Sequence, residues 1–341
     1  MIQQAIAKLT AFQNITADES AAAMNEIMSG EATTAQIGAF LAAMRMKGET
    51  TEEIIGCARV MREKAQALRL PTDVVDIVGT GGDGSNTFNI STCSAFVVAA
   101  AGMPVAKHGN RSVSSKCGSA DVLEKLGGNI SLPPAQAAQC FDRTGLCFLF
   151  APVYHLSMKY AAAPRRELGV RTIFNILGPL ANPAAASYQL LGVYDAKLVE
   201  PMATVLMNLG VRSAMTVFGH DGLDEISLSA PTTVCEVRNG RMSSYILHPE
   251  QFGIRPAPLS EVVGGDAALN AQYVLAVLQG RHGPKRDIVL LNASAALYIA
   301  GRAATLKEGV RLAADAIDSG AALQKLEDYK RVSNELAEAS A

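Results

Sequence analysis

One stretch of this chain sets the expected fold, and it reads Asp76-Ile-Val-Gly-Thr-Gly-Gly-Asp-Gly-Ser-Asn-Thr-Phe-Asn-Ile-Ser-Thr92. An apolar strand over 74–78 runs into a loop with four glycines, and a helix is expected to begin at Ser91 and Thr92. Glycines let the backbone approach an anion closely, and the free N–H groups at a helix start point at that anion. The stretch therefore predicts a phosphate-binding site at the end of a strand.

A second loop, Lys107-His-Gly-Asn-Arg-Ser-Val-Ser-Ser115, follows another apolar strand and carries cations and hydroxyls. Lysine and hydroxyl groups suit phosphate oxygens, whereas Asn110 could hold a polar part of a second substrate. A solvated surface loop is the alternative, and it fits Arg111 and Lys116 best. Ser119 could cap the next helix, bind phosphate, or do both. Two such loops predict a substrate with more than one phosphate.

The composition narrows the class of protein. The chain has 341 residues, of which 49% are apolar, and a formal net charge of −2. This charge gives no basic surface for nucleic acid, so any anion binding must be local. We expect no signal peptide and no membrane span, because no apolar run is long enough to cross a bilayer. The six cysteines form no C-x-x-C pair, so we expect reduced, mostly buried thiols in a cytoplasmic protein.

Only helices are predicted in the first 70 residues. Thr16 with Glu19, Thr33 with Gln36, and Thr50 with Glu53 have the capping-box spacing, and helices should stop at Gly30 and Gly48. After a linker at 70–73, strand and helix patterns alternate. Strands are expected over 74–78, 104–107, 146–150, 188–194 and 213–218. Helices are expected over 91–101, 119–126, 134–144, 153–168 and 197–209.

This alternation predicts a mainly parallel sheet covered by helices. A hairpin is expected from 233–237 and 243–247, joined at Asn239-Gly240. Long helices over 267–279, 285–303 and 305–319 should close the chain, the last with a capping box at Thr305 and Glu308.

Other readings of the glycine stretch fit less well. Gly79-x-Gly81-x-x-Gly84 matches the dinucleotide fingerprint, but no acidic residue lies between Asp83 and Asp121, where that fold needs one. A P-loop would need Gly-Lys-Ser/Thr, which does not follow. A plain glycine-rich turn would not explain the polar groups that crowd around Thr87.

A third feature is Asp221-Gly-Leu-Asp224-Glu225. Magnesium prefers a few carboxylates plus substrate phosphates, so this turn would suit a magnesium–diphosphate substrate. Alone, an acidic turn is more often only solvated. A fourth feature is the expected helix 153–168, in which His155 and Met158 would share a face and Arg165 could bind a carboxylate.

The fourth feature also has plainer readings. Arg165 could be an exposed arginine near a helix end, and His155 could be a packed core histidine. Residues 171–183 contain two tight turns, at Gly178-Pro179 and Asn182-Pro183, and read as mainly structural, in the position of a hinge beside the site.

Together these runs resemble the anthranilate phosphoribosyltransferase family. The resemblance is collinear over nearly the whole chain and rests on Gly79-Thr-Gly-Gly-Asp83, Asn89-Ile-Ser-Thr92, Lys107-His-Gly-Asn-Arg111, Gly118-Ser-Ala-Asp-Val-Leu-Glu124, Phe148-Leu-Phe-Ala-Pro152, 171–183 and Asp224-Glu225. It implies transfer of phosphoribose from phosphoribosyl diphosphate to the amine of anthranilate, in tryptophan biosynthesis. It also implies Mg²⁺, a homodimer, and the nucleoside phosphorylase type of fold.

In that fold a small all-helical domain, here 1–70 joined by helices from about 165–185, is hinged to a larger α/β domain, here 73–341. By resemblance, phosphoribosyl diphosphate would be held by Gly79, Gly82, Asp83, Thr87, Asn89, Ile90, Ser91, Thr92, Lys107, His108, Gly109, Asn110, Arg111, Ser112, Val113, Ser114, Ser115 and Ser119. Anthranilate would be held by Gly79, Asn110 and Arg165, with His108 and His155 close by. Magnesium would be held by Ser91, Asp224 and Glu225. No residue is expected to act as acid, base or nucleophile.

Small departures from the family pattern fall at Val153, Ser157 and Ile176, beside the expected anthranilate path. A pyrimidine nucleoside phosphorylase of the same fold is the nearest alternative, but the Asn89–Thr92 run and the acidic pair favour a magnesium diphosphate. A non-catalytic relative that binds nucleic acid would need a basic face, which the net charge of −2 disfavours.

Overall fold

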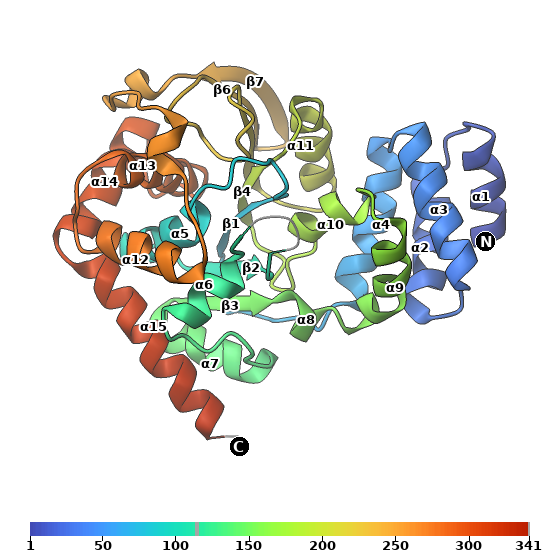
Figure 1. Cartoon of the computed structure of the whole chain (residues 1–341), viewed down its shortest axis with the longest axis horizontal. Helices are drawn as coiled ribbons and strands as arrows, with labels where there is room; N and C mark the ends of the chain where they lie inside the picture. Colours follow the sequence, from blue (N-terminus) through green and yellow to red (C-terminus); the bar gives the residue numbers. More distant parts are fainter. Residues whose placement is uncertain (113–115, 340–341) are drawn as a thin grey trace.

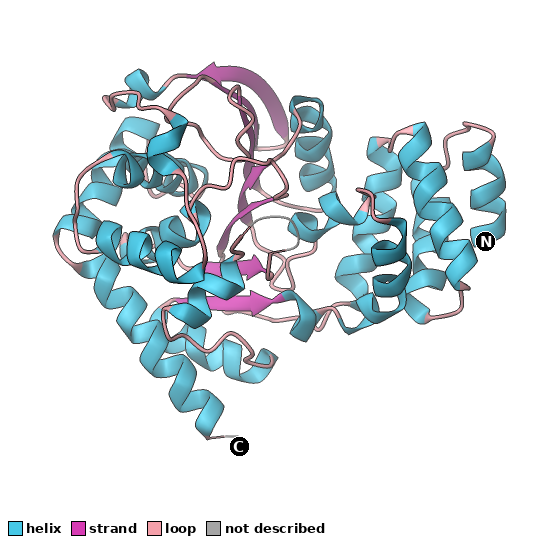
Figure 2. Cartoon of the chain, viewed as in Figure 1, coloured by secondary structure: helices cyan, strands magenta, loops and turns pink. Residues whose placement is uncertain are grey.

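The computed structural model describes residues 1–112 and 116–339 of the chain. A bundle of N-terminal helices lies beside a larger part in which helices surround a sheet (Figure 1). Figure 2 shows that the strands are confined to this larger part. The predicted fold class, a small helical part beside a larger, mainly parallel sheet covered by helices, is confirmed.

The helical part begins with α1 (Ile2–Thr10), α2 (Ala17–Ser29), α3 (Thr34–Lys47) and α4 (Thr51–Lys64). Thr16, Thr33 and Thr50 each accept a hydrogen bond from the N–H three residues later, whose Glu or Gln side chain bonds back. All three predicted capping boxes are therefore confirmed. Two later helices, α9 (Lys159–Leu168) and α10 (Phe174–Leu180), return to this bundle and pack on α2, α3 and α4.

In the described part of the chain, seven strands form one sheet in the order β3-β2-β1-β4-β5-β6-β7. Neighbours from β3 to β5 run parallel, whereas β6 and β7 are antiparallel. The predicted parallel strands are correct to within two residues. Asn239 and Gly240 join β6 to β7 with φ of 52° and 70°, which confirms the hairpin. The strands are β1 (Val75–Gly79), β2 (Val105–Gly109), β3 (Leu146–Phe150), β4 (Tyr188–Gly192), β5 (Ser213–Gly219), β6 (Thr232–Arg238) and β7 (Arg241–Leu247).

The helices of the larger part are α5 (Ile90–Ala100), α6 (Ser119–Lys125), α7 (Pro134–Thr144), α8 (Ala151–Tyr154), α11 (Val199–Asn208), α12 (Ala267–Leu278), α13 (Pro284–Ile299), α14 (Leu306–Asp318) and α15 (Ala321–Glu338). The sequence analysis missed α15, although Ala322, Leu326, Tyr329 and Val332 are buried at helical spacing along it. Only half of the capping box predicted at Thr305 forms, because the Glu308 carboxylate accepts from the N–H of residue 304 instead.

The predicted continuous helix over 153–168 is wrong. α8 ends at Tyr154, His155 leaves the helical region with φ −110° and ψ 62°, and a short 3-10 turn over 156–158 precedes α9. Tyr154 and His155 are both fully or nearly fully buried, whereas Leu156 is 56% exposed. The chain therefore turns at His155, between a helix that ends with the buried Tyr154 and a 3-10 turn that begins with the exposed Leu156.

Each face of the sheet packs into a different hydrophobic cluster. Leu190 joins the cluster that includes α5 and α13, whereas its neighbour Leu191 joins the cluster of α11, α10 and the N-terminal bundle. Successive strand residues point to opposite faces, so the two clusters lie back to back across the sheet. The bundle core is therefore continuous with one face of the sheet.

Arg62 of α4 connects the bundle to the sheet helices. Its Nε donates to the carbonyl of Leu180, at the end of α10, at 2.6 Å, and its Nη1 donates to the carbonyl of Leu209, after α11, at 3.0 Å. A cation suits these two helix C-termini, where carbonyls lack partners. The linker after α4 is tied further by Gln66 N, which donates to the carbonyl of Tyr154 at 2.8 Å.

All six cysteines are free and buried, as the sequence analysis expected. Among the helices of residues 1–112 and 116–339, none combines the length and apolar character that a membrane crossing needs.

Candidate active site

Three segments meet at the carboxyl edge of the parallel strands. They are the glycine loop (79–89, after β1), the second loop (109–119, after β2) and the acidic segment (220–229, after β5). Because β1, β2 and β5 all run in the same direction, their carboxyl ends lie at one edge. In open α/β sheets this is the edge where ligands bind.

Asp224 of the acidic segment lies against the ends of β1 and β4. Its Oδ2 accepts a hydrogen bond from the N–H of Gly81 at 2.7 Å. A Cβ on Gly79 would come within 2.3 Å of Asp224 Oδ2, and one on Gly192 would come within 1.5 Å of the Asp224 carbonyl oxygen. Both strand ends therefore need glycine, because any side chain would push the acidic segment away from the sheet.

Buried side chains fix the acidic segment on its other side. Asn292 of α13 is fully buried and bonds both backbone groups of Ile226, accepting from its N–H at 2.9 Å and donating to its carbonyl at 3.0 Å. Asp221 accepts from the hydroxyl of Ser227 at 2.7 Å. Asp224 is thus held by the segment around it and not only by the sheet.

The acidic pair, Asp224 and Glu225, has an electrostatic environment that suits a divalent cation. The pKa of Asp224 is raised to about 7, mainly by burial and also by the charge of Asp83. Burial and the charge of Asp224 raise the pKa of Glu225 well above its usual value. Asp83 Oδ2 is buried and has no hydrogen-bond partner in the described residues. A bound cation would stabilise the charged form of all three carboxylates.

No group of three or more His, Cys, Asp and Glu side chains within residues 1–112 and 116–339 could hold a metal ion by itself. Mg²⁺ commonly takes one or two protein carboxylates and completes its shell with substrate oxygens and water. The donor set of the acidic pair and the Ser91 hydroxyl fits Mg²⁺ on that condition.

Lys107 is buried at the end of β2. Its Nζ donates to the carbonyl of Ile77 at 2.5 Å and to the hydroxyl of Ser91 at 3.3 Å. Burial lowers the pKa of Lys107, while the charges of Asp76 and Glu225 oppose that change. A cation therefore lies beneath the N-terminus of α5, close to the predicted magnesium ligands.

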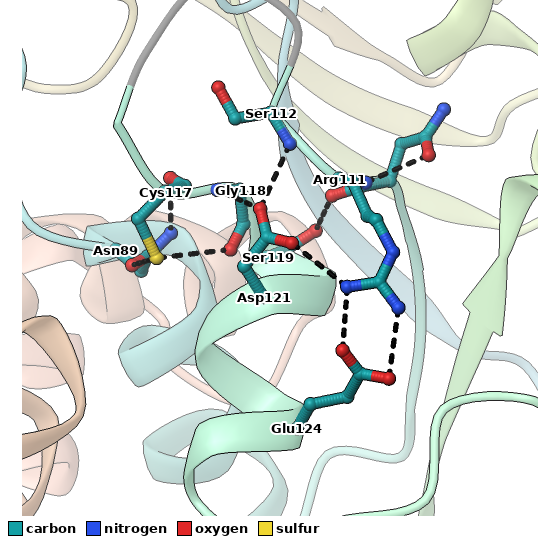
Figure 3. Close-up of polar contacts among 9 residues, drawn as sticks. Asn89, Arg111, Ser112, Cys117, Gly118, Ser119, Asp121 and Glu124 are labelled. Atoms are coloured by element: carbon teal, nitrogen blue, oxygen red, sulfur yellow. Dashed lines mark hydrogen bonds and ion pairs between the residues drawn. The ribbon is translucent and has the colours of Figure 1, made fainter. Parts of the chain in front are cut away.

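The second loop is closed by residues of its own neighbourhood (Figure 3). Asp121 Oδ2 accepts hydrogen bonds from the N–H of Ser112 at 3.0 Å and of Gly118 at 2.8 Å. Arg111 pairs with both oxygens of Glu124, at 2.6 and 2.9 Å, and with Asp121 at 3.0 Å. Its guanidinium therefore faces the carboxylates of α6, so in this structure it stabilises the loop.

The side chain of Asn89 joins the two loops. It donates to the carbonyl of Cys117 at 3.3 Å (Figure 3). It also accepts from the amide of Asn270 at 2.9 Å. Asn110 Oδ1 accepts from the N–H of Arg111 at 2.8 Å, and its carbonyl accepts from the hydroxyl of Ser119 at 3.2 Å.

The other predicted phosphate-site residues fall on the same edge or close to it. Thr87 pairs with residue 263 in an isolated bridge, Ile90 is buried at the start of α5, and Thr92 Oγ1 is buried with no partner among the described residues. Three further predicted residues, Val113, Ser114 and Ser115, lie outside the described residues.

His108 and His155 form a buried pair beside the second loop, with ring centroids 5.1 Å apart. Burial lowers the pKa of His108 to about 3 and that of His155 to about 4, so both rings are neutral at pH 7. The Nε2 atom of each ring has no hydrogen-bond partner in the described part of the chain. Beside His155 lies a small pocket, lined also by Met28, Met61, Lys64, Ser157 and Met158.

Arg165 of α9 is half-buried, with its guanidinium 4.9 Å from the centroid of the Phe174 ring. Burial lowers its pKa. No carboxylate of the described residues forms an ion pair with it, although most buried charges in proteins are paired. The sequence analysis expected His155 and Met158 to share one helix face. The break at His155 means that they do not.

Comparison with known proteins identifies the family. Residues 3–65 match the helical bundle domain of a glycosyl transferase family, and residues 71–323 match its a/b domain. An anthranilate phosphoribosyltransferase of Ruminiclostridium cellulolyticum is 58% identical over 334 residues, which cover 98% of each chain. The chain belongs to the anthranilate phosphoribosyltransferase family.

Solved structures of anthranilate phosphoribosyltransferases have the same fold. The Thermus thermophilus enzyme superimposes with a TM-score of 0.92 at 42% identity, over 97% of this chain and 99% of that one. The Saccharomyces cerevisiae enzyme in complex with PRPP and Mg gives a TM-score of 0.90 at 28% identity, with 98% of each chain covered.

The sequence analysis missed residues that shape the site of this anthranilate phosphoribosyltransferase family member. Asp76 accepts from the N–H of His108 at 3.1 Å and from the amide of Asn182 at 2.8 Å, which joins β1, β2 and the segment after α10. Arg171 donates to the carbonyl of Gly82. The only local signal in the sequence was Asp76 itself, a charged residue inside an apolar strand. Its partner Asn182 lies 106 positions away, so the contact between them could not be predicted.

Proposed function

We propose that the edge formed by the glycine loop, the second loop and the acidic pair carries out the family's reaction, the transfer of the phosphoribosyl group to anthranilate in tryptophan biosynthesis. The C1′–O bond to diphosphate breaks, a bond forms from C1′ to the anthranilate nitrogen with inversion, and that nitrogen releases a proton. One observation carries the proposal. Asp224 of the acidic segment packs against the glycine loop and accepts a hydrogen bond from Gly81 N at 2.7 Å, so carboxylates and backbone donors face one site.

The donor substrate is phosphoribosyl diphosphate, held by the glycine loop, the start of α5 and the second loop. α5 is eleven residues long, and the N–H groups of its first turn favour an anion. Lys107 adds a cation below it. The proposed ligands are Gly79, Gly82, Asp83, Thr87, Asn89, Ile90, Ser91, Thr92, Lys107, His108, Gly109, Asn110, Arg111, Ser112, Val113, Ser114, Ser115 and Ser119.

Mg²⁺ is the metal of the reaction, and a yeast relative has been solved with PRPP and Mg. Ser91, Asp224 and Glu225 would hold it. When bound, the ion neutralises negative charge that develops on the leaving diphosphate. The burial of the acidic pair supports this assignment, since it raises the pKa of both carboxylates and makes their charge costly without a cation.

Anthranilate is placed between the second loop and α9, near Gly79 and Asn110. Arg165 is proposed to bind its carboxylate, because a half-buried guanidinium without an acidic partner suits a planar anion. His108 and His155 lie close by as neutral rings. An aromatic amine is neutral at pH 7 and exposes its lone pair without help, so positioning and electrostatics suffice and no general base is needed.

Two domains would enclose the substrates. The helical domain, 1–70 with the helices of 165–185, would close on the α/β domain, 73–341, and exclude the water that competes with the amine. The packing of α9 and α10 on the N-terminal bundle supports this division.

The chain is further proposed to act as a cytoplasmic homodimer. Six free, buried thiols fit a reducing compartment. Phe12 and Met46 are 64% and 73% exposed on adjacent segments of the bundle, where Lys47 also reaches Asn14. Large apolar side chains exposed together mark interaction surfaces. Light scattering on a Phe12→Ser/Met46→Ser variant tests this, and an unchanged dimer mass would place the interface elsewhere.

Fluorescence provides the direct assay of the activity. Anthranilate fluoresces and the chain has no tryptophan, so loss of anthranilate emission after adding phosphoribosyl diphosphate and Mg²⁺ reports the reaction without interference. The emission should persist when the metal is chelated or when diphosphate replaces the donor substrate. Persistent emission in the complete mixture would refute the proposed function.

A further inference from the structure

Three glycines in the middle of the glycine loop have a backbone conformation that other residues rarely adopt. Gly81, Gly82 and Gly84 have positive φ values of 67°, 74° and 79°. Glycine adopts these conformations without strain, but it also loses more conformational freedom than other residues when it is fixed. An anion site made of backbone N–H groups therefore binds better when another group has already ordered the loop.

In the described part of the chain, the backbone of residues 82–85 is tied to other elements at one point, the carbonyl oxygen of Gly82. That oxygen accepts a hydrogen bond from Nη2 of Arg171. The loop is also held before this point, at the N–H of Gly81, and after it, at the carbonyl of Asn86. Arg171 therefore fixes the free middle between two anchored ends.

Arg171 is itself held by the sheet. It lies between α9 and α10, and its guanidinium carbon is 4.4 Å from the centroid of the Tyr194 ring, two residues beyond β4. The N–H of Tyr194 donates to Thr80 Oγ1 at 3.0 Å, so the same strand end also anchors the start of the glycine loop. No carboxylate of the described residues forms an ion pair with Arg171.

The contact fixes the direction of a neighbouring donor. The C=O and N–H of a trans peptide point in opposite directions. A Gly82 carbonyl that faces Arg171 therefore turns the N–H of Asp83 to the other side of the loop. The positive charge of Arg171, which no acidic side chain of the described residues neutralises, also favours an anion nearby.

We infer that Arg171 is a positioning residue for donor binding: it holds the Gly82–Asp83 peptide in the orientation that receives the diphosphate, and Tyr194 holds Arg171. The inference rests on the proposed function and deepens it. It gives a role in donor binding to a segment that the sequence analysis treated as mainly structural.

The fluorescence assay tests the inference when both substrate concentrations are varied. Arg171→Met should raise the KM for phosphoribosyl diphosphate about tenfold, as expected for the loss of one charge-assisted hydrogen bond. The anthranilate KM and the melting temperature should not change, since Arg171 is exposed. Arg171→Lys should recover part of the loss because its ammonium can still donate to the carbonyl.

Tyr194 provides the matched variants. Tyr194→Phe keeps the ring and should behave like the wild type, whereas Tyr194→Leu should raise the same KM. Because Tyr194 acts through Arg171, the double variant R171M/Y194L should be no worse than R171M alone. Additive effects, an unchanged donor KM in R171M, or a lower melting temperature in R171M would each overturn the inference.

Titration with inorganic diphosphate distinguishes positioning from direct contact. Both R171M and Y194L should bind it more weakly. If R171M alone loses affinity, Arg171 contacts the ligand directly and the positioning role is wrong. Absence of turnover in the wild type would instead refute the proposed function, so the two failures are distinguishable.

Discussion

The glycine loop and the second loop follow neighbouring strands, yet they are held in place in different ways. Asp121 closes the second loop from nine positions away or fewer. The glycine loop is held by Asp224, 143 positions away at Gly81, and by Arg171, 89 positions away. The second loop can therefore close locally, whereas the glycine loop needs residues from the segment after β5 and from the segment between α9 and α10.

This difference has a functional consequence. Backbone groups of the glycine loop are held by Arg171, between α9 and α10, and by Asp224 of the acidic segment, so we expect substitutions in either segment to alter the proposed donor site. The second loop also contacts a distant residue, since Asn89 donates to the carbonyl of Cys117 from 28 positions away, but Asp121 closes it locally. Because Asp121 holds the second loop and Arg171 holds the glycine loop, variants at these two positions should affect the two loops to different degrees.

The largest expected effect is on the glycine loop. Asp224→Asn should lower kcat about 100- to 1,000-fold and weaken the dependence on Mg²⁺. The change removes a proposed metal ligand and the negative charge of the group that accepts the hydrogen bond from Gly81 N–H. The anthranilate KM should change little. Asp142→Asn, at an exposed carboxylate of α7, is the control. An unchanged Mg²⁺ dependence in D224N would count against the metal role.

Acid should act through the histidines beside the second loop. The pKa of His155 is lowered to about 4 by burial, so the unfolded state binds more protons between pH 6.5 and 4. Its contribution to stability is complete above pH 6.5 and is lost as the pH falls toward 4, by about 2 to 3 kcal/mol.

The burial of Asp76, which raises its pKa to about 6, has the opposite sign and would mask this loss in the wild type alone. The measurement is therefore the difference in unfolding free energy between wild type and His155→Gln, from urea titrations at several pH values. A difference that stays constant from pH 7 to 4.5 would contradict the prediction.

A variant outside both loops sharpens the comparison. Arg165→Ala should raise the anthranilate KM about 10- to 50-fold, the expected loss of a paired carboxylate, and leave the donor KM unchanged. Arg166→Ala, at the exposed neighbouring position, should have no effect. If R165A raised only the KM for phosphoribosyl diphosphate, the carboxylate assignment would be wrong.

The smallest expected effect belongs to the second loop. Asp121→Ala removes the acceptor for two loop N–H groups and should raise the donor KM about three- to tenfold without lowering kcat. Glu124→Gln removes only the exposed pair with Arg111 and should change the same KM less than twofold, because surface ion pairs contribute only about 0 to 1 kcal/mol. Equal effects of the two variants would show that Arg111, not the closed backbone, matters.

Most of the fold could be predicted from local patterns in the sequence. The strands of the parallel sheet and the capping boxes of α2 to α4 depend on residues within a few positions of each other, so periodicity and spacing suffice to find them. The break at His155 could not be predicted in this way, because no glycine or cap spacing marks the residue whose φ of −110° and ψ of 62° interrupt the helix.

The candidate site divides along the same line. Gly79 to Thr92 and Lys107 to Ser119 are contiguous, so their chemistry can be seen in the sequence. The contacts of Arg171 with Gly82, and of Asn292 with Ile226, join residues 89 and 66 positions apart. No local pattern distinguishes these side chains from an ordinary exposed arginine or an ordinary helical asparagine.

The close approach of Asp224 to the ends of β1 and β4 leaves no room for one added carbon atom at either strand end. Laboratory evolution toward a different amine acceptor therefore has little freedom at the sheet edge. Its freedom lies on the helical side, where Met28, Met61 and Ser157 line the pocket beside His155. Gly79 and Asn110, which are proposed to contact both substrates, link the two sites at this edge, so we expect changes at the pocket residues to alter acceptor preference with the least effect on the diphosphate site.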